Sequence, residues 1–243
     1  MNHPRLSNFG WTAVVISVVL STAFVLQDLA PGLPLSQINP ESQRLRPRAD
    51  HKPIAVAFVL TDGATMIDFA GPWEVFQDAG GPDGVDYFHL FTVGESKGPV
   101  HISGGMTVIP DYTFENAPPA GIIVVPAQRG APSLADWLRR RSKDADVVMS
   151  VCTGAFQLGK AGLLDGKPAT THHDFYDEFQ KNFPKVTLVK GRRYVESDDV
   201  IYTAGGLSSG IDLALHVVDR YFGRDVAQKT AIYMEYQGTG WKE

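Results

Sequence analysis

The chain has 243 residues, of which 44% are hydrophobic, and this is enough for one substantial core in a single α/β domain. Charged residues make up 20% and the formal net charge is −5, so the surface is slightly acidic and a nucleic-acid partner is not expected. The single cysteine, Cys152, excludes an internal disulfide, a cysteine-based zinc site and a Cys-pair redox motif.

Residues 1–30 predict an export signal or a membrane anchor. A short polar start with Arg5 precedes an apolar stretch from Trp11 to Leu26, which is short for a spanning helix and suits the core of a signal peptide. The small residues Ser21-Thr22-Ala23 offer a cleavage point after Ala23. An uncleaved single-span anchor stays open as the alternative. Either interpretation places the rest of the chain outside the cytoplasm, in the periplasm of a bacterium.

A linker and one globular domain are expected to follow. Residues 31–53 are rich in Pro, Ser, Gln and Arg and show no periodicity, which is typical of a linker. The domain is expected to span residues 54–243. Its first run, Ile54–Leu60, is continuous, apolar and rich in β-branched residues, as in a strand buried on both faces of a parallel sheet.

Strands and helices alternate along the rest of the domain. Further strands are predicted over residues 85–94, in two short pieces around Gly104-Gly105, and over residues 121–126, 146–151, 167–170 and 186–205. Helices are predicted over residues 68–80, 132–145, 153–162, from 175 through about 183, 209–223 and 224–236. This alternation predicts a doubly wound α/β fold, a three-layer sandwich around a mostly parallel sheet.

The stretch "VVMSVCTGAFQLG" predicts a nucleophile elbow at Cys152. An apolar strand leads into the cysteine, Thr153 and Gly154 follow, and a helical pattern comes next. Small neighbours such as Gly154 and Ala155 suit so tight a turn, and the helix N-terminus is expected to lower the pKa of the thiol and to favour thiolate. The alternative, that Cys152 is a small buried hydrophobic residue, stays open on this pattern alone.

An acid stands in an apolar loop after the first strand. Asp68 lies in "MIDFAGP", at the carboxyl end of a predicted parallel strand, where open α/β sheets bind their ligands. The residue is either a helix N-cap or a group with a chemical role. Pro72 fits an early turn of the helix that follows.

Four stretches together resemble the DJ-1/PfpI superfamily, which shares a class I glutamine amidotransferase-like fold. They are "MSVCTGAFQLGKAGLLDGKPATTHH", "AGGLSSGIDLAL", "MIDFAGPWEVF" and the late "EY" at Glu235-Tyr236. The resemblance covers about Ile54 to Tyr236. It is greatest to the branch that contains isonitrile hydratase and the amidotransferase-like domains of some AraC-type regulators. It implies a flavodoxin-like sheet with a cysteine nucleophile elbow, and a homodimer.

The resemblance also implies site residues. The Cys, Thr and Asp positions of the isonitrile hydratases match Cys152, Thr153 and Asp68, and Gly154 completes the elbow. Where superfamily members often have Gly-Gly, this chain has Ala127-Gln128, so the backbone N–H of Gln128 is the expected oxyanion donor. Its long side chain is expected to narrow or repolarise the pocket.

Two further segments are assigned to the pocket wall. In "ATTHH", His172 is a candidate to orient water or substrate, and a structural role at a helix start stays open. The adjacent His172 and His173 lack the i, i+4 spacing of a shared helical metal site, so neither a metal nor another cofactor is expected. In "AGGLSSG", Gly205-Gly206 is interpreted as a tight turn with Gly206 in the pocket wall, and the motif lacks the Lys-Ser/Thr ending of a phosphate loop.

The expected activity is cysteine-dependent hydration of a small-molecule isonitrile to an N-substituted formamide. The Cys152 thiolate attacks the terminal carbon, Asp68 supplies a proton or steers water, and the Thr153 N–H and hydroxyl hold the developing charge. Three alternatives stay open: a glyoxalase- or amidase-like activity, a redox sensor and a ligand sensor. About thirty residues follow "SSGIDLAL", which leaves no room for a helix-turn-helix module and argues against direct DNA binding.

Overall fold

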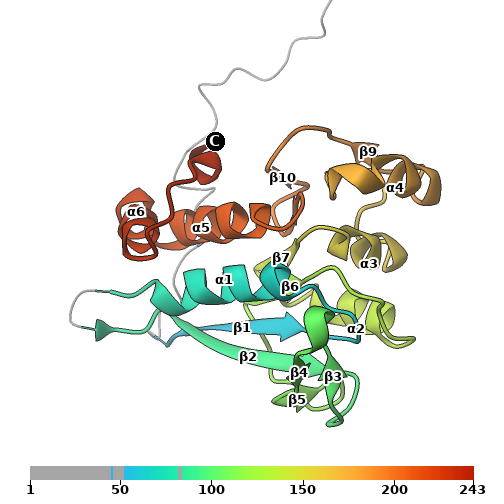
Figure 1. Ribbon diagram of the computed structural model, residues 1–243, viewed down its shortest axis with the longest axis horizontal. Coiled ribbons are helices and arrows are strands. Elements are labelled where there is room, and N and C mark those ends of the chain that lie inside the picture. Colours follow the sequence, from blue (N-terminus) through green and yellow to red (C-terminus); the bar gives the residue numbers. More distant parts are fainter. Residues whose placement is uncertain (1–44, 46–51, 82–83) are drawn as a thin grey trace, which may run out of the picture. The chain divides into compact units, whose positions relative to one another are not determined.

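A seven-stranded sheet forms the centre of the part of the chain that the computed structural model describes, which is residue 45, residues 52–81 and residues 84–243 (Figure 1). The strand order is β10-β11-β7-β6-β1-β2-β5, and every neighbouring pair is parallel except β10 with β11 at one edge. The strands are β1 (Ile54–Val59), β2 (Phe88–Gly94), β5 (Tyr112–Thr113), β6 (Ile122–Val125), β7 (Val147–Ser150), β10 (Tyr194–Glu196) and β11 (Ile201–Ala204).

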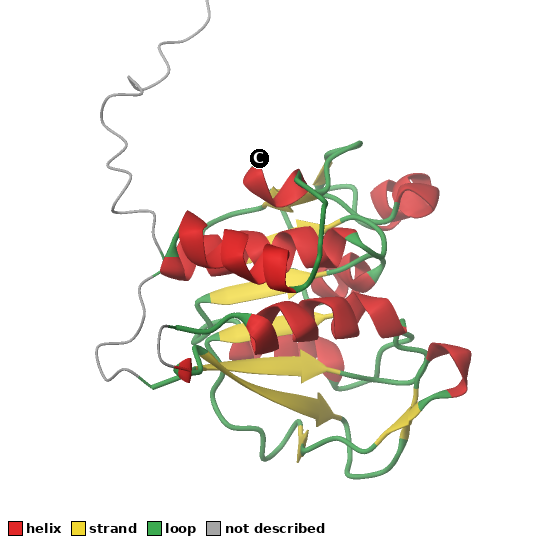
Figure 2. Cartoon of the chain, turned by 60° about the vertical axis from the view of Figure 1, so that its left-hand side comes forward, coloured by secondary structure: helices red, strands yellow, loops and turns green. Residues whose placement is uncertain are grey.

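Helices cover both faces of this sheet (Figure 2). One face carries α1 (Met66–Asp78), α5 (Ser209–Phe222) and α6 (Arg224–Tyr233), and the other carries α2 (Leu134–Arg141), α3 (Gly154–Lys160) and α4 (Tyr176–Asn182). The described part also contains three short 3-10 helices, η4 (Ser103–Gly105), η5 (His173–Phe175) and η6 (Gly240–Lys242). The predicted three-layer α/β sandwich with a mostly parallel, flavodoxin-like sheet is confirmed.

The central position of β1 in the sheet explains why its sequence is apolar throughout. Val56 and Phe58 point into the core layer beneath α1, α5 and α6, while Ala57 and Val59 point into the layer beneath α2 and α3. All four are 0–1% exposed. A central parallel strand with helices on both sides has no solvent face, so the polar alternation of a surface strand is absent.

Two small strand pairs lie outside the main sheet. β3 (Val100–His101) and β4 (Thr107–Val108) pair antiparallel on either side of η4, as predicted around Gly104-Gly105. β8 (Pro168–Ala169) and β9 (Thr187–Leu188) pair in parallel next to α4. The turn inside η4 needs Gly104, whose φ is +78° and therefore lies in the left-handed region. The β3–β4 hairpin forms one wall of the cavity described below, which His101 and Ser103 line.

Two glycines allow α1 and α5 to cross closely above the carboxyl end of β7. A Cβ atom at Gly71 would lie 2.9 Å from Ile211 Cγ1, and one at Gly210 would lie 2.9 Å from the methyl groups of Val151. Helix α1 begins at Met66, two residues earlier than expected, so Pro72 lies inside the helix and not in its first turn. Because of this earlier start, Asp68 is the third residue of α1 and not its N-cap, which is Thr65.

The expectation of a signal peptide, a transmembrane anchor and an exported domain is corrected. In the described part of the chain, no helix combines the length and the apolar character that a bilayer crossing requires. The stretch on which the expectation rested, residues 1–30, lies outside the described residues, as does most of the predicted linker. Within that linker, Leu45 is described; it is half-buried and packs against the core.

Candidate active site

Cys152 stands on a strained turn between β7 and α3. Its φ is +58°, a left-handed backbone conformation that residues other than glycine seldom adopt. Its main chain is held on both sides, since Cys152 N donates to Gly205 O at 2.8 Å and Thr171 Oγ1 donates to Cys152 O at 2.9 Å. Gly154 is required by sterics, because a Cβ atom there would lie 2.1 Å from Val125 O. This geometry is that of a nucleophile elbow.

Asp68 is brought from the first helix to face this sulfur. The residue is 0% exposed, its Oδ2 accepts a hydrogen bond from Ala127 N at 3.2 Å, and its carboxyl group is a hydrogen-bonding neighbour of the Cys152 thiol. The other carboxylate oxygen, Oδ1, is buried and has no hydrogen-bond partner among the described residues. Burial raises the pKa of Asp68 to about 7, although the hydrogen bonds from Ala127 and Cys152 oppose the rise.

The thiol pKa differs from the expectation. Burial, followed by the negative charge of Asp68, raises the pKa of the Cys152 thiol to about 11, against the hydrogen bonds from the backbone N–H groups of Thr153 and Leu207. The prediction of a resting thiolate is therefore wrong. A helix N-terminus stabilises an anion only modestly, while the thiol is 7% exposed and faces a carboxyl group. At neutral pH, Cys152 is a protonated thiol.

Leu207 is a functional residue that the sequence interpretation missed. It follows Gly206, it has a φ of +52°, and its backbone N–H points to the sulfur of Cys152. Its side chain is 45% exposed. The signal was present in "AGGLSSG", where a glycine pair just after a buried strand, β11, lies next to the elbow in the sheet. The donor is a backbone group, so no side-chain pattern marked it.

Gln128 lies at the site, but its side chain has a different task from the one expected. Its Oε1 accepts from Thr61 N at 2.6 Å and from Thr61 Oγ1 at 2.9 Å, and its Nε2 donates to Val59 O at 3.1 Å. These bonds tie the loop after β6 to the end of β1 and use the polar atoms of the side chain. The Gln128 N–H donates to no described residue, so it is available to a ligand.

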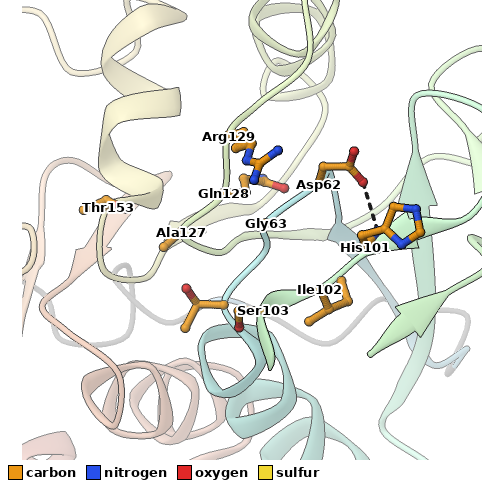
Figure 3. A pocket seen from close by; sticks show the side chains of 10 residues that line it. Asp62, Gly63, His101, Ile102, Ser103, Ala127, Gln128, Arg129 and Thr153 are labelled. Carbon is orange, nitrogen blue, oxygen red and sulfur yellow. Dashed lines mark hydrogen bonds between the residues drawn. The ribbon is translucent and has the colours of Figure 1, made fainter. Parts of the chain in front are cut away.

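A cavity of about 570 Å³ opens beside the elbow (Figure 3). Thr153, Ala127 and Thr65 line it next to the Asp68–Cys152 pair, while Cys152 itself does not. The remaining lining residues come from the loop after β1, the β3–β4 hairpin and the loop after β6: Asp62, Gly63, His101, Ile102, Ser103, Gln128 and Arg129. The volume is in the range of small-molecule sites.

His172 and Gly206 lie together, next to the elbow but not in the cavity lining. A Cβ atom at Gly206 would lie 2.1 Å from His172 Cδ2, so the glycine is needed for the imidazole to pack there. The rings of His172 and His173 stack with centroids 4.4 Å apart, and with Asp174 they bring three potential metal-ligand atoms within 4.8 Å of one another. His172 Nδ1 already accepts from Asp174 N at 3.2 Å, which favours the structural role.

The sequence profile of the DJ-1/PfpI family matches residues 54–220. The chain belongs to the DJ-1/PfpI family. An isonitrile hydratase from Pseudomonas putida is 33% identical over 189 residues, which are 75% of this chain and 78% of that protein. A crystal structure of a ThiJ/PfpI family protein from Pseudomonas syringae superimposes with a TM-score of 0.67 at 25% identity, covering 77% of each chain.

Some proteins that resemble this chain are named as transcriptional regulators and not as enzymes. The HTH-type transcriptional regulator GbdR of Pseudomonas aeruginosa is 27% identical over 203 residues, which are 82% of this chain and 51% of that protein. This chain therefore spans about half of that regulator. Membership of the DJ-1/PfpI family is thus common to a named enzyme and a named regulator, and the choice between them depends on the site.

Proposed function

We propose that this protein is a cysteine-dependent enzyme that hydrates an isonitrile to an N-substituted formamide. The observation that carries the proposal is the buried pair of Asp68 and Cys152 at the head of the elbow. The match to an isonitrile hydratase over three quarters of the chain supports it. A carboxyl group with a pKa of about 7 can accept a proton and return it at neutral pH, and this reaction needs both transfers.

The first step is addition of the thiol across the terminal carbon. Ionised Asp68 takes the proton of Cys152 and delivers it to the isonitrile carbon, while the sulfur bonds to the same carbon. A carbon–sulfur bond and a carbon–hydrogen bond form, the sulfur–hydrogen bond breaks, and the product is a thioimidate on Cys152. The backbone N–H groups of Thr153 and Leu207 face the sulfur and stabilise the negative charge that it carries during transfer.

The second step is hydrolysis of the thioimidate. Asp68 removes a proton from water, whose oxygen bonds to the former isonitrile carbon, and passes this proton to the nitrogen. As the adduct collapses, the carbon–sulfur bond breaks, Asp68 transfers the hydroxyl proton of the adduct to the Cys152 sulfur, and the formamide is released. The Gln128 N–H and the Thr153 hydroxyl are the groups proposed to hold the oxygen. Asp68 serves both steps, so one carboxyl group acts as base and acid in turn.

Turnover of a small aliphatic isonitrile by the full chain tests the proposal. Cys152→Ala is expected to abolish formamide production, and Asp68→Asn and Thr153→Val to lower kcat/KM, with about a hundredfold loss or more for Asp68→Asn. Asp165→Asn is the matched control, because this exposed carboxylate forms a surface ion pair with Lys185. Assays with an aldehyde and an amide separate the glyoxalase-like and amidase-like alternatives. Full turnover by Cys152→Ala would refute the proposal.

Ligand sensing without turnover is the second candidate function. It is favoured by the protonated thiol, which is unreactive at rest, and by the regulator among the relatives. This second function would be supported if the chain bound a small molecule tightly and released it chemically unchanged, and if no substrate were turned over. The raised thiol pKa disfavours the redox-sensor alternative, since thiolate is the form that peroxide oxidises.

We also propose that the chain forms a homodimer and that its domain begins near residue 54. Sedimentation equilibrium of the full chain measures the first directly, and a mass of one chain would reject it. Limited proteolysis tests the second, since the proposal expects a stable fragment that begins near residue 54.

A further inference from the structure

One cationic side chain at the cavity has no acidic or hydrogen-bonding partner among the described residues. The guanidinium group of Arg129 lines the cavity and is exposed, and it makes no ion pair, hydrogen bond or ring contact with any residue in the described part of the chain. Other arginines near functional segments are paired; Arg193, for instance, binds the buried carboxylate of Asp212 at 2.5 Å. All the donor groups of the Arg129 guanidinium are therefore open to a ligand.

The position of this side chain is determined by the backbone beneath it. Arg129 N donates to Asp62 O at 3.1 Å, which fixes the loop after β6 against the loop after β1. A Cβ atom at Gly63 would lie 3.3 Å from Arg129 Cγ and 3.4 Å from Arg129 Nε, so the arginine stem lies over this glycine. Gly63 has a φ of +75°, which favours glycine on its own account. In Figure 3, Arg129 lies between Thr153 and His101.

Neighbouring groups add to the donor capacity of this part of the cavity. Ser103 Oγ accepts from Met66 N at 3.1 Å, so its hydroxyl hydrogen is free to be donated inward. The Thr65 hydroxyl makes no capping bond to α1. One acid, Asp62, also lines the cavity, but its carboxylate accepts from His101 N at 2.9 Å and so holds the β3–β4 hairpin to the loop after β1.

We propose that Arg129 binds a carboxylate on the substrate, so that the preferred isonitrile carries a carboxyl group on the carbon attached to its isonitrile nitrogen, as an isocyano acid does. The guanidinium fork matches the planar carboxylate, and the cavity has the volume for both ends of such a molecule. Thr153, next to Cys152, and Arg129 line the same cavity, so a molecule that fills this cavity reaches both. This inference rests on the proposed function, because it names the substrate class of the same site.

Binding of the reaction product isolates the carboxylate contact from catalysis. Calorimetry on the full chain compares N-formylglycine with its neutral analogue N-formylglycinamide. The wild type is expected to bind the acid about tenfold more tightly, as one charge-assisted hydrogen-bond pair provides. Arg129→Gln is expected to remove this preference. Lys229→Gln removes the same charge from an exposed lysine of α6 that shares no cavity with Arg129, and this variant is expected to keep the preference for the acid.

The outcomes separate the two proposals. Equal binding of the acid and the amide by the wild type, or an unchanged preference in Arg129→Gln, overturns the carboxylate subsite, whether or not isonitriles are turned over. An Arg129-dependent preference without any turnover of isocyanoacetate or of a neutral isonitrile supports the subsite and overturns the proposed function. With turnover, Arg129→Gln is expected to raise KM about tenfold for isocyanoacetate and to leave KM for the neutral isonitrile unchanged.

Discussion

The side chains of Asp68 and Cys152 face each other at the carboxyl edge of the sheet, and burial raises the pKa of both. Between pH 7 and pH 11 the pair therefore holds one proton, which resides on the sulfur at rest. The opposite arrangement, with thiolate and carboxylic acid, contains the same proton. It is reached by a single transfer across a contact that already exists, and this is the reactive form in the proposed addition.

The pH dependence of kcat/KM tests this description. Activity is expected to rise through an apparent pKa of about 7, as the pair loses its first proton, and to fall near pH 11, as it loses the second. A resting thiolate would instead give an acid limb well below pH 7. In Asp68→Asn, the residual kcat/KM should no longer rise with an apparent pKa of about 7. A rate that is flat from pH 5 to pH 9 in the wild type contradicts the shared-proton description.

Asp68 also makes stability depend on pH. Its folded-state pKa of about 7 is above its ordinary value of 3.8, so folding favours the protonated carboxyl and stability decreases as the pH rises from 4 to 7. Asp68→Asn abolishes this titration. The free energy of unfolding of the variant, relative to that of the wild type, is therefore expected to be a few kcal/mol higher at pH 8 than at pH 4. Each unit by which the folded-state pKa is raised corresponds to about 1.4 kcal/mol.

Urea denaturation at pH 4 and pH 8 measures this gain. Asp165→Asn serves as the control, since its ion pair with Lys185 is on the surface and contributes about 1 kcal/mol or less. A stability difference between Asp68→Asn and the wild type that is the same at both pH values would show that the buried carboxyl does not titrate with a raised pKa.

Gly154 is predicted to be the least replaceable residue of the elbow. Gly154→Ala puts a methyl group 2.1 Å from Val125 O and 2.9 Å from Pro126 O, and Val125 O is held at the end of β6 by a hydrogen bond from Val151 N. The loss of stability is expected to be about 3 kcal/mol or more. Gly80→Ala is the control, because the nearest atom there lies 3.4 Å from the new methyl group. Thermal melts that show equal losses for both variants contradict this prediction.

Gln128 is predicted to matter for stability more than for chemistry. Gln128→Ala leaves the buried Thr61 N–H without its acceptor and should destabilise the fold by about 1–3 kcal/mol. The backbone N–H at residue 128 is kept, so the folded variant should retain most of its activity. Gln180→Ala removes a single hydrogen bond to Val186 O and should cost less. A stable but inactive Gln128→Ala would instead assign the side chain to catalysis.

The sequence was sufficient for most of the elements and for the turn that carries Cys152, and insufficient for the protonation of its thiol. Continuous apolar runs such as Ile54–Leu60 predict a doubly covered sheet because periodicity reports burial. Cys152 and Asp68 were found because an elbow and a strand-end acid are local patterns. The thiol pKa depends on how completely α1 and α5 close over the sulfur, which is a property of tertiary packing. For the same reason the Gln128 contacts and the Leu207 N–H were not predicted.

The main chain of Cys152 is held by Gly205 and Thr171, and Asp68 comes with α1 from the N-terminal part of the domain. None of these partners is close to it in sequence. The site is therefore complete only when β11 has paired with β7 and α1 has docked. Until then a nascent or partly unfolded chain exposes an ordinary cysteine, more acidic and more open to alkylation and oxidation than the one in the finished protein.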